Sequence, residues 1–299
     1  MPTVSVIIPA KDAADSLPAA LNAVASQTYP NIVDVVVAVA DEASAQASRG
    51  ATVVDNPTGN TAKGLNLAIA EAKGDVLVRC DAHVILPNDY VATAVSTLLS
   101  TESANVGGMQ VPVGDRPWER AIGSAMTSPL GAGDARYRIG GDGGPAETVY
   151  LGVFRRGSLE AIGGFDESFV RTQDYELNHR LIEAGETVWF DPSLKVKYKP
   201  RGSLRDLARQ YWDYGSAKRQ FNAKHPGKLR WRQILPPLLV IAVVVSILVS
   251  FWVPTALLLV AVYLLVMLLA GLPSWRKSAA LVTMHLAWGL GFLVGGRRR

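Results

Sequence analysis

The sequence predicts an α/β domain with a mixed, mainly parallel sheet flanked by helices, followed by transmembrane helices. Two observations carry this prediction. Short β-branched runs alternate with helical patterns over residues 1–110, which is typical of strand–helix–strand units and parallel sheets. Long apolar stretches begin at residue 234, and two of them, Ile234–Trp252 and Pro254–Leu272, are each about long enough to cross roughly 30 Å of hydrocarbon.

The predicted strands place polar residues at one edge of the sheet. We expect strands at Val4–Ile8, Asp34–Ala40, Ala51–Val54 and Asp75–Arg79. One helix should begin near Ser16, and another should cover Thr61–Lys73 and be closed by Gly74. Ligands of parallel sheets bind beyond the carboxyl ends of the strands. The segments at these ends are Pro9–Asp12, Ala40–Glu42 and Asp81–His83, so a site is expected there.

Two further segments precede the apolar stretches. Residues 112–148 are rich in glycine and proline without clear periodicity, which predicts a functional lid or a disordered loop. Residues 203–221 have a helical stripe. Its members are Leu204, Leu207, Tyr211, Tyr214, Lys218 and Phe221. With Arg205, Arg209 and Arg219 beside the stripe, we favour an interfacial helix; an ordinary core-packing stripe is the alternative.

The apolar stretches predict a helical hairpin and a weaker third segment. Ile234–Trp252 and Pro254–Leu272 should form the hairpin, with a tight turn at Val253–Pro254. Ser278–Gly296 either spans, is re-entrant or lies at the interface. Three full crossings would place Arg297–Arg299 on the side opposite to the N-terminus, against the positive-inside tendency. The expected regions are therefore a cytosolic domain (1–200), interfacial helices (201–233) and a membrane domain of two or three helices (234–299).

Charge and cysteine content narrow the partners and the compartment. The net charge is +4, and basic residues concentrate between Lys195 and Arg232, directly before the apolar block. This arrangement favours attraction to anionic membrane lipid, and no nucleic-acid partner is expected. The single cysteine, Cys80, excludes an intrachain disulfide and suits a reducing compartment. The start of the chain has no signal-peptide pattern, so the N-terminal domain should stay on the cytoplasmic side of the plasma (inner) membrane.

Five motifs in order resemble those of family 2 glycosyltransferases. They are Val4–Asp12, Val39–Ser44, Gly74–His83, Gly163–Glu167 and Gln173–Leu177. The succinoglycan-biosynthesis (ExoA-like) branch is similar in further segments: Ser128–Gly133, Arg136–Arg138 and Gly152–Gly157. The resemblance covers about residues 3–220. It implies a GT-A type, Rossmann-like fold and a membrane-anchored, inverting, metal-dependent transferase.

The resemblance and the chemistry of a nucleotide-sugar donor together predict a metal site. A departing nucleoside diphosphate needs a cation, and hard cations prefer oxygen ligands, which Asp81 can supply. Two residues later the family usually has another carboxylate, but here it is His83. On an extended segment both side chains would point the same way, and imidazole shifts the preference from Mg²⁺ towards Mn²⁺. The alternative for Asp81 is a turn or helix-cap residue.

Other residues are assigned to the donor by resemblance. Asp41 matches the acid that recognises the nucleoside, and Asp12 and Lys63 would lie near the base or phosphates. The expected donor-binding set is Pro9, Lys11, Asp12, Asp41, Lys63 and Asp81. An aspartate at a strand end is also a common turn former, which is the alternative for Asp41.

Asp174 is the expected catalytic base. Inverting transfer to a hydroxyl needs a group that takes the proton of that hydroxyl. The family usually has another acid before this aspartate; Gln173 replaces it, so burial would have to tune the pKa of Asp174. The alternative is an exposed acid at a helix start, like Glu176 and Asp166. The expected acceptor or diphosphate residues are Gly164, Phe165, Arg209, Gln210, Tyr211, Trp212, Lys218 and Arg219. A membrane-anchoring role is the alternative for those at 209–219.

These assignments predict an enzyme of cell-surface polysaccharide biosynthesis. It would move a hexose from UDP- or GDP-hexose to a hydroxyl of a lipid-linked glycan, with Mn²⁺ or Mg²⁺ as cofactor. A related possibility is direct transfer of the sugar to a polyprenyl phosphate. That acceptor is already ionised, so Asp174 would have less to do. A third possibility, an inactive membrane scaffold, is disfavoured because Asp81 and Asp174 are both present.

Overall fold

The chain folds into two units. The computed structural model describes residues 1–296, so the expectation about Arg297–Arg299 lies outside the described residues. The first unit comprises Met1–Val111 and Gly140–Tyr198, and the second comprises Pro112–Ile139 and the chain from Lys199 onward. Residues 112–139, which the sequence places in the first domain, therefore cluster with the C-terminal helices.

The first unit is built on a mixed sheet with strand order β3-β2-β1-β4-β7-β5-β8-β6. Its strands are β1 (Val4–Ala10), β2 (Ile32–Val39), β3 (Thr52–Asp55), β4 (Val76–Arg79), β5 (Asn105–Pro112), β6 (Gly144–Pro145), β7 (Tyr150–Arg155) and β8 (Val188–Tyr198). Strand β1 is parallel to β2 and β4, and β2 is parallel to β3, whereas β7 is antiparallel to β4 and β5. The predicted fold class is confirmed.

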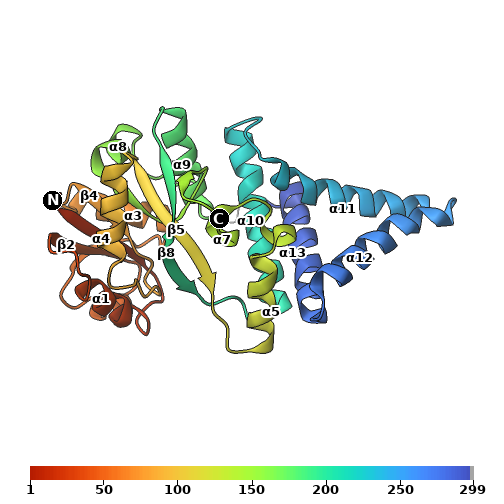
Figure 1. Ribbon diagram of the computed structural model, residues 1–299, viewed down its shortest axis with the longest axis horizontal. Coiled ribbons are helices and arrows are strands. Elements are labelled where there is room, and N and C mark those ends of the chain that lie inside the picture. Colours follow the sequence, from red (N-terminus) through yellow and green to blue (C-terminus); the bar gives the residue numbers. More distant parts are fainter. Residues whose placement is uncertain (297–299) are drawn as a thin grey trace. The chain divides into compact units, whose positions relative to one another are not determined.

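Helices cover both faces of this sheet (Figure 1). They are α1 (Leu17–Ala25), α2 (Glu42–Gln46), α3 (Thr61–Glu71), α4 (Tyr90–Ser100), α8 (Arg156–Ala161) and α9 (Gln173–Glu183). Side chains alternate along β1. Val6 packs with Leu17 and Val91 of α1 and α4, whereas Ile7 packs with residues of α3 and α9. The β-branched runs of the sequence are therefore strands buried on both faces.

Gly74 has a different role from the one predicted. Helix α3 ends at Glu71, and its last residues are followed by an extended cap at Ala72. A Cβ on Gly74 would lie 2.5 Å from the backbone nitrogen of Ser5. The residue is therefore a glycine because β1 passes against it, and not because it closes the helix.

Of the two alternatives for residues 112–148, the disordered loop is wrong, whereas a functional lid stays a prediction. This stretch contains α5 (Pro117–Met126), α6 (Pro129–Ala132), α7 (Arg136–Ile139) and strand β6. Glu119, only 3% exposed, accepts from the backbone nitrogens of Asp115 and Arg116 and so caps the start of α5. Glycine and proline masked the helical pattern because they begin helices and permit close contacts as well as forming loops.

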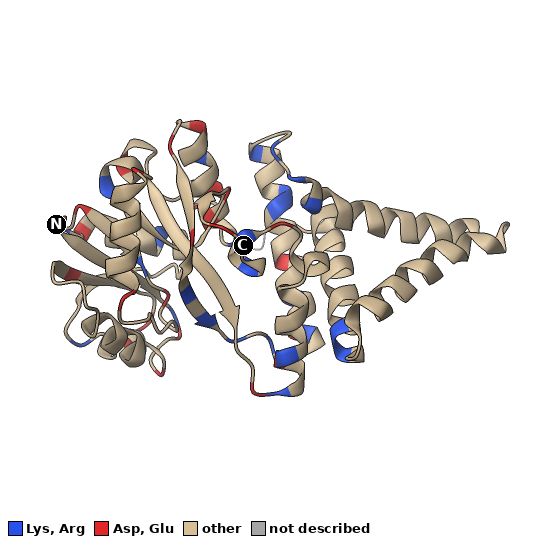
Figure 2. Cartoon of the chain, in the orientation of Figure 1, with Lys and Arg blue, Asp and Glu red and all other residues tan. Residues whose placement is uncertain are grey.

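The second unit is helical. Its longer helices are α10 (Leu204–Lys224), α11 (Trp231–Val249), α12 (Leu257–Gly271) and α13 (Trp275–Val294), and a 3₁₀ turn η1 (Pro254–Ala256) joins α11 to α12. Within the described residues, three helical segments are long and apolar enough to cross a membrane: α11, η1 with α12, and α13. Figure 2 shows that α11 and α12 carry almost no charged side chains.

The aromatic–aliphatic stripe of α10 faces the interior of this unit. Leu207, Tyr211 and Phe221 are buried, and Ser216 Oγ of α10 donates to Gly291 O of α13 at 3.2 Å. This burial is typical of a core-packing stripe, which was the alternative to an interfacial helix. An interfacial role for residues 201–233 stays a prediction.

Candidate active site

Three neighbouring parallel strands bring the predicted donor residues to one edge of the sheet. In the register of β1, Ala10 lies beside Val39 of β2 and Ile7 lies beside Arg79 of β4. Lys11 and Asp12 follow β1, Asp41 follows β2 and Asp81 follows β4. Pro9 lies within β1, beside Ala38. The carboxyl ends of these strands are the expected place for a ligand.

Asp41 organises the loop after β1. Asp41 Oδ2 accepts from Asp12 N at 2.8 Å and from Ser44 Oγ at 2.8 Å, and Oδ1 accepts from Ser44 N at 2.8 Å. The backbone N–H groups of Ser44 and Asp12 hold the pKa of Asp41 below its usual range. Asp12 is held in a left-handed conformation with φ 49°. Asp41 thus caps the start of α2, a role that differs from the turn former given as its alternative, and nucleoside recognition stays a prediction.

Two predicted donor lysines lie near the start of α3. A Cβ on Gly59 would lie 2.8 Å from Lys11 Cδ, so the Lys11 side chain passes directly over this glycine. Asn60 Oδ1 caps the helix by accepting from Lys63 N at 3.2 Å. The helix start adds partial positive charge to that of the lysines, which favours an anionic ligand.

Arg79 links the predicted metal ligand to the predicted base. The Arg79 side chain is buried at the end of β4, with the residue 6% exposed. Its Nε and Nη2 both lie 2.9 Å from Asp81 Oδ1, and its Nη1 forms an ion pair with Asp174 Oδ1. Arg79 is not among the site residues predicted from the sequence. Its signal there is a charged residue that ends an otherwise apolar strand, two positions before Asp81.

Burial and charge act on Asp174 in opposite directions. Asp174 lies in the first turn of α9. Burial raises the pKa of its carboxyl, the nearby Asp81 charge raises it further, and the Arg79 guanidinium opposes both. Burial is thus the main influence, as expected with Gln173 in place of an acid. The Asp174 side chain is still 40% exposed, so a substrate can reach it.

The segment after Asp81 is a turn. Val84 N donates to Asp81 O at 2.9 Å, which closes the turn through Ala82 and His83. The expectation of an extended segment, on which Asp81 and His83 point the same way, is therefore wrong. Ala82 is buried and anchors the turn, whereas His83 is exposed. A ligand role for His83 stays a prediction.

Tyr150 is a second residue that the sequence analysis missed. It begins β7, which runs antiparallel to β4, and so it lies towards the Asp81 end of that strand. Burial raises the pKa of the Tyr150 phenol, and the Asp81 charge raises it further. The phenol therefore stays protonated beside Asp81. The one signal for Tyr150 in the sequence is that an aromatic residue begins a strand.

Glu176 has a structural role. It is fully buried, and Arg180 Nε and Nη2 donate to its oxygens at 2.8–3.0 Å. Arg180 also donates to the carbonyls of Ile162 and Gly164 at 2.7 and 2.8 Å. The pair thereby holds the segment that contains the predicted acceptor residues Gly164 and Phe165. Glu176 is not the exposed acid that the alternative to Asp174 required.

The other predicted acceptor residues lie on α10, in the second unit. Tyr211 and Lys218 are each 7% exposed, and burial lowers the pKa of Lys218. Arg219 Nη1 donates to Leu293 O at 2.8 Å, and Gln210 Nε2 donates to Tyr214 Oη at 3.1 Å. Arg209 and Trp212 complete the set on this helix. Several of these side chains hold their own unit together, and acceptor binding by them stays a prediction.

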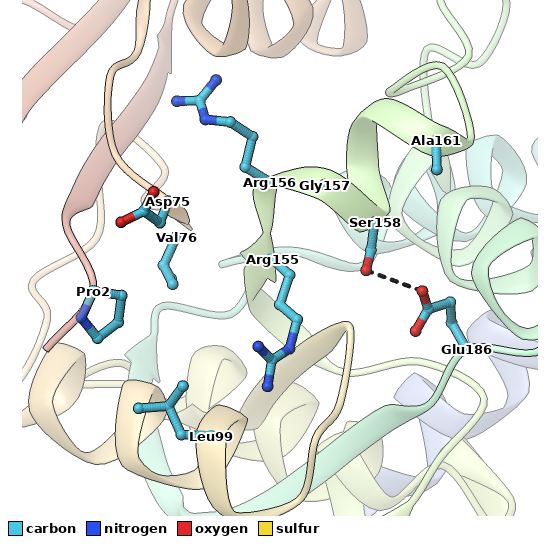
Figure 3. Close-up of a pocket in the computed structure, with 10 residues that line it drawn as sticks. All are labelled: Pro2, Asp75, Val76, Leu99, Arg155, Arg156, Gly157, Ser158, Ala161 and Glu186. Atoms are coloured by element: carbon cyan, nitrogen blue, oxygen red, sulfur yellow. Dashed lines mark hydrogen bonds between the residues drawn. The ribbon is translucent and has the colours of Figure 1, made fainter.

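A cavity of about 430 Å³ lies at the opposite end of β4 from Asp81 (Figure 3). Arg155 donates to the carbonyls of Leu98 and Ser103, each at 2.9 Å. Arg156 donates to those of Gly74 and Ala72, each at 2.7 Å. Both guanidinium groups therefore donate to backbone carbonyls at or just after the C-terminal ends of α3 and α4. Because the cavity adjoins Asp75, where β4 begins, it is separate from the candidate active site.

Comparisons with known proteins identify the family of the chain. The family model for glycosyl transferase family 2 matches residues 5–163. The succinoglycan biosynthesis protein ExoA of Rhizobium meliloti (strain 1021) is 33% identical over 262 residues, which cover 82% of this chain and 78% of that protein. A Methanococcus voltae protein named dolichyl N-acetyl-alpha-D-glucosaminyl phosphate 3-beta-D-2,3-diacetamido-2,3-dideoxy-beta-D-glucuronosyltransferase is 25% identical over 51% of this chain and 49% of its own length.

Solved structures share the fold. The mannosyltransferase PcManGT from Pyrobaculum calidifontis, solved with GDP-Man and Mn²⁺, superposes with a TM-score of 0.68 at 21% identity, covering 96% of this chain and 87% of that one. The first unit thus has the GT-A fold, and the apolar helices mark a membrane-associated protein. By its family match and its ExoA-like sequence, the chain belongs to glycosyl transferase family 2 and is a glycosyltransferase.

Proposed function

We propose that this enzyme transfers a hexose, with inversion, from UDP- or GDP-hexose to a hydroxyl of a lipid-linked glycan in cell-surface polysaccharide biosynthesis. The observation that carries the proposal is the Asp81–Arg79–Asp174 link. It places an accessible acid beside the carboxylate expected at the metal. A base for the acceptor hydroxyl and a cation for the leaving diphosphate are the two groups that this reaction needs.

The residues after β4 fit a divalent cation. Both bonds from Arg79 reach Asp81 Oδ1, and none of the described residues donates to Oδ2. Asp81 Oδ2 and the exposed His83 imidazole would hold Mn²⁺ or Mg²⁺. When bound, the ion supplies positive charge for the departing diphosphate. The Mn²⁺ and GDP-Man bound to PcManGT support this assignment.

The remaining roles follow the sheet edge. Lys11, Lys63 and the start of α3 attract the donor phosphates, and Asp41 and Asp12 accept hydrogen bonds from the nucleoside beside Pro9. Asp174 takes the proton from the acceptor hydroxyl as that oxygen attacks the anomeric carbon. Gly164 and Phe165 line the acceptor side. On α10, the exposed Arg209 is the proposed contact for the acceptor or the diphosphate, because Tyr211, Lys218 and Arg219 pack within their own unit.

A lipid-linked acceptor suits a chain with membrane helices. The name of the Methanococcus voltae relative specifies a sugar already carried on dolichyl phosphate as the acceptor, which supports a glycan hydroxyl over a bare polyprenyl phosphate. The basic residues between Lys195 and Arg232 favour anionic lipid on the cytoplasmic side of the plasma membrane. There the catalytic unit would meet cytosolic nucleotide sugars.

A donor screen tests the proposal. The full chain, purified in detergent, is incubated with UDP- and GDP-hexoses, lipid extract containing lipid-linked glycans, and Mn²⁺. Release of UDP or GDP that requires the lipid extract is the expected result. Equal release without any lipid acceptor, or no release with any donor, would contradict it.

A further inference from the structure

We propose that the chain crosses the membrane twice, through α11 and through η1 with α12, and that α13 lies along the lipid–water interface. Helix α13 has 20 residues and is apolar enough to span. Length and composition alone therefore give three crossings. The partners of α13 within the second unit give a different answer.

A polar helix accompanies the second half of α13. Ser216 Oγ donates to Gly291 O at 3.2 Å, and Arg219 Nη1 donates to Leu293 O at 2.8 Å. A Cβ on Gly291 would collide with Trp212 O, so the two backbones touch. Helix α10 also carries these charged residues: Arg205, Asp206, Arg209, Asp213, Lys218 and Lys224. Because such a helix is costly in hydrocarbon, the half of α13 beside it lies outside the hydrocarbon core.

The first half of α13 meets the short helices of residues 112–139. The Trp275 ring at its start lies 5.5 Å from that of Trp118 in α5, centroid to centroid. In its middle, His285 Nε2 lies 2.8 Å from Leu130 O of α6. Short helices joined by irregular backbone are not tolerated against lipid tails. Non-spanning elements therefore accompany α13 along its whole length.

The contacts of α13 with the hairpin reach from the base of the hairpin to about the middle of its two helices. On α11 a Cβ at Gly289 of α13 would meet Pro236 and Val240, and on α12 Tyr263 Oη lies 3.2 Å from His285 Nδ1. Beyond this level the hairpin is exposed, with Phe251 79% and Trp252 80% accessible. Figure 1 shows that α11 and α12 extend away from α13 towards their common tip, whereas α13 runs beside α10. A third span would accompany the hairpin to its tip.

The start of α13 has the chemistry of a membrane surface. The Arg276 guanidinium lies 4.8 Å from the Trp275 ring centroid and 5.8 Å from that of Trp118, and Lys277 follows. Tryptophan and basic residues are enriched at headgroup depth. The partner of this helix is thus the bilayer surface.

Sided labelling of the full chain in closed membrane vesicles tests this topology. Single cysteines are introduced by Gly296→Cys after α13, Ala223→Cys on α10 and Thr255→Cys at the hairpin tip, all at exposed positions. A membrane-impermeant maleimide is applied to right-side-out and inverted vesicles. Gly296→Cys and Ala223→Cys should react in one orientation, and Thr255→Cys in the other.

The unmodified chain is the background control, because Cys80 is fully buried. Labelling of Gly296→Cys together with Thr255→Cys would overturn the proposal, since a third crossing would then be required. Labelling of Gly296→Cys only after detergent is added would overturn it too, because the residue after α13 would then lie within the bilayer.

A different observation supports a second inference, which rests on the proposed function. We infer that Asn66 is a positioning residue that fixes the acceptor-side loop Gly163–Glu167 against α3. Asn66 Oδ1 accepts from Phe165 N at 2.8 Å, and Nδ2 donates to Phe165 O at 2.8 Å and to Glu167 Oε1 at 3.1 Å. One side chain thus pairs with both backbone groups of Phe165.

Neighbouring residues reinforce this clamp. Asn60 Nδ2 donates to Glu167 O at 2.8 Å. A Cβ on Gly164 would lie 2.7 Å from Asn66 Oδ1, and Gly164 has a φ of 70°, so this position requires glycine. Lys63 and Asn66 lie three residues apart on one face of α3. A single helix therefore sets the spacing between the donor phosphates and the acceptor-side loop.

The variant Asn66→Ala separates positioning from general stability. We expect the acceptor KM to rise about tenfold or more, since small misplacements are costly in transfer, whereas donor affinity and slow hydrolysis of the donor by water should persist. Asn31→Ala is the matched control, because Asn31 also donates to two carbonyls, those of Met1 and Pro2, away from the site.

The outcomes separate this inference from the proposed function. Parallel loss of donor binding and transfer in Asn66→Ala would overturn the positioning role, and so would an unchanged acceptor KM. If the unmodified enzyme released no nucleoside diphosphate from any donor, the proposed function itself would fail.

Discussion

Arg79 and Asp174 lie 95 positions apart in the chain, and an ion pair joins Arg79 Nη1 to Asp174 Oδ1. The same guanidinium donates to Asp81 Oδ1 at 2.9 Å. A buried cation thus holds two carboxylates for which the sequence predicts different tasks, one at the metal and one at the acceptor. The predictions about catalysis start from this arrangement.

Asp174→Asn should nearly abolish transfer to a hydroxyl acceptor. The amide keeps the shape but cannot take the proton, and losing a general base typically costs about 10²–10⁴-fold in rate. Nucleotide-sugar affinity should survive. Transfer rate and donor affinity are measured together, with Glu71→Gln, at an exposed position at the far end of α3, as the control acid. Near-normal transfer to a hydroxyl acceptor by Asp174→Asn would falsify the base assignment. If the acceptor is a polyprenyl phosphate, which is already ionised, the variant should keep much of its transfer rate.

Arg79→Met should move the acid limb of the kcat–pH profile to higher pH. The base must be deprotonated, so activity falls as pH falls through the pKa of Asp174. Burial and Asp81 raise that pKa, and the Arg79 charge opposes the rise. Without the Arg79 charge, the pKa of Asp174 should therefore rise further. Arg49→Met, at an exposed position, should leave the limb in place; a limb that stays fixed or moves to lower pH in Arg79→Met would contradict this account.

Activity should depend on a divalent cation held by Asp81. Asp81→Ala should lose at least about a hundredfold in rate, the usual scale for removing electrostatic stabilisation of a transition state. His83→Ala should lose less, and its loss should differ between Mn²⁺ and Mg²⁺. Rates are compared with each metal and after chelation. Full turnover in excess EDTA would rule out the metal.

Gly74→Ala should destabilise the first unit. The added methyl group would press on the backbone of β1, 2.5 Å from Ser5 N, and overpacking typically costs about 1–3 kcal/mol. Gly157→Ala is the matched control, because a Cβ there meets nothing within 4 Å. The comparison is thermal unfolding of both variants in detergent. Equal unfolding temperatures would show that β1 can shift freely.

The full chain should need detergent to leave the membrane fraction. Apolar side chains of the hairpin are widely exposed, including Leu258 at 63% and Val262 at 58%. Alkaline carbonate washing, which strips peripheral proteins, should leave the chain in the pellet. A protein that stays monodisperse without any amphiphile would contradict a membrane-spanning hairpin.

Local sequence signals located much of the fold and the outline of the site. The β-branched runs became the strands, and the ends after β1, β2 and β4 lie at one sheet edge. The motifs singled out Asp81 and Asp174, but their link through Arg79 joins distant parts of the chain, and no local pattern encodes it. The extended geometry predicted for the segment through His83 is wrong because the chain turns there, closed by the hydrogen bond from Val84 N to Asp81 O.

Residues 112–139 and α13 also differ from what their composition predicts, because their packing partners come from other parts of the chain. The helices of residues 112–139 carry the glycines and prolines that usually mark loops, yet these residues begin helices or allow close contacts there. The apolar sequence of α13 is compatible with a span, and only its packing on α10 and α5 distinguishes an alternative. Composition reports which environment a segment tolerates, whereas its neighbours decide where it lies.

The hairpin also limits what this enzyme does alone. From Gln233 to Trp275 the sequence holds no charged residue, and two apolar helices cannot enclose a water-filled passage. Under the topology and function proposed above, we therefore expect the hairpin to anchor the enzyme and not to conduct its product. Export of the glycan would then require a second protein.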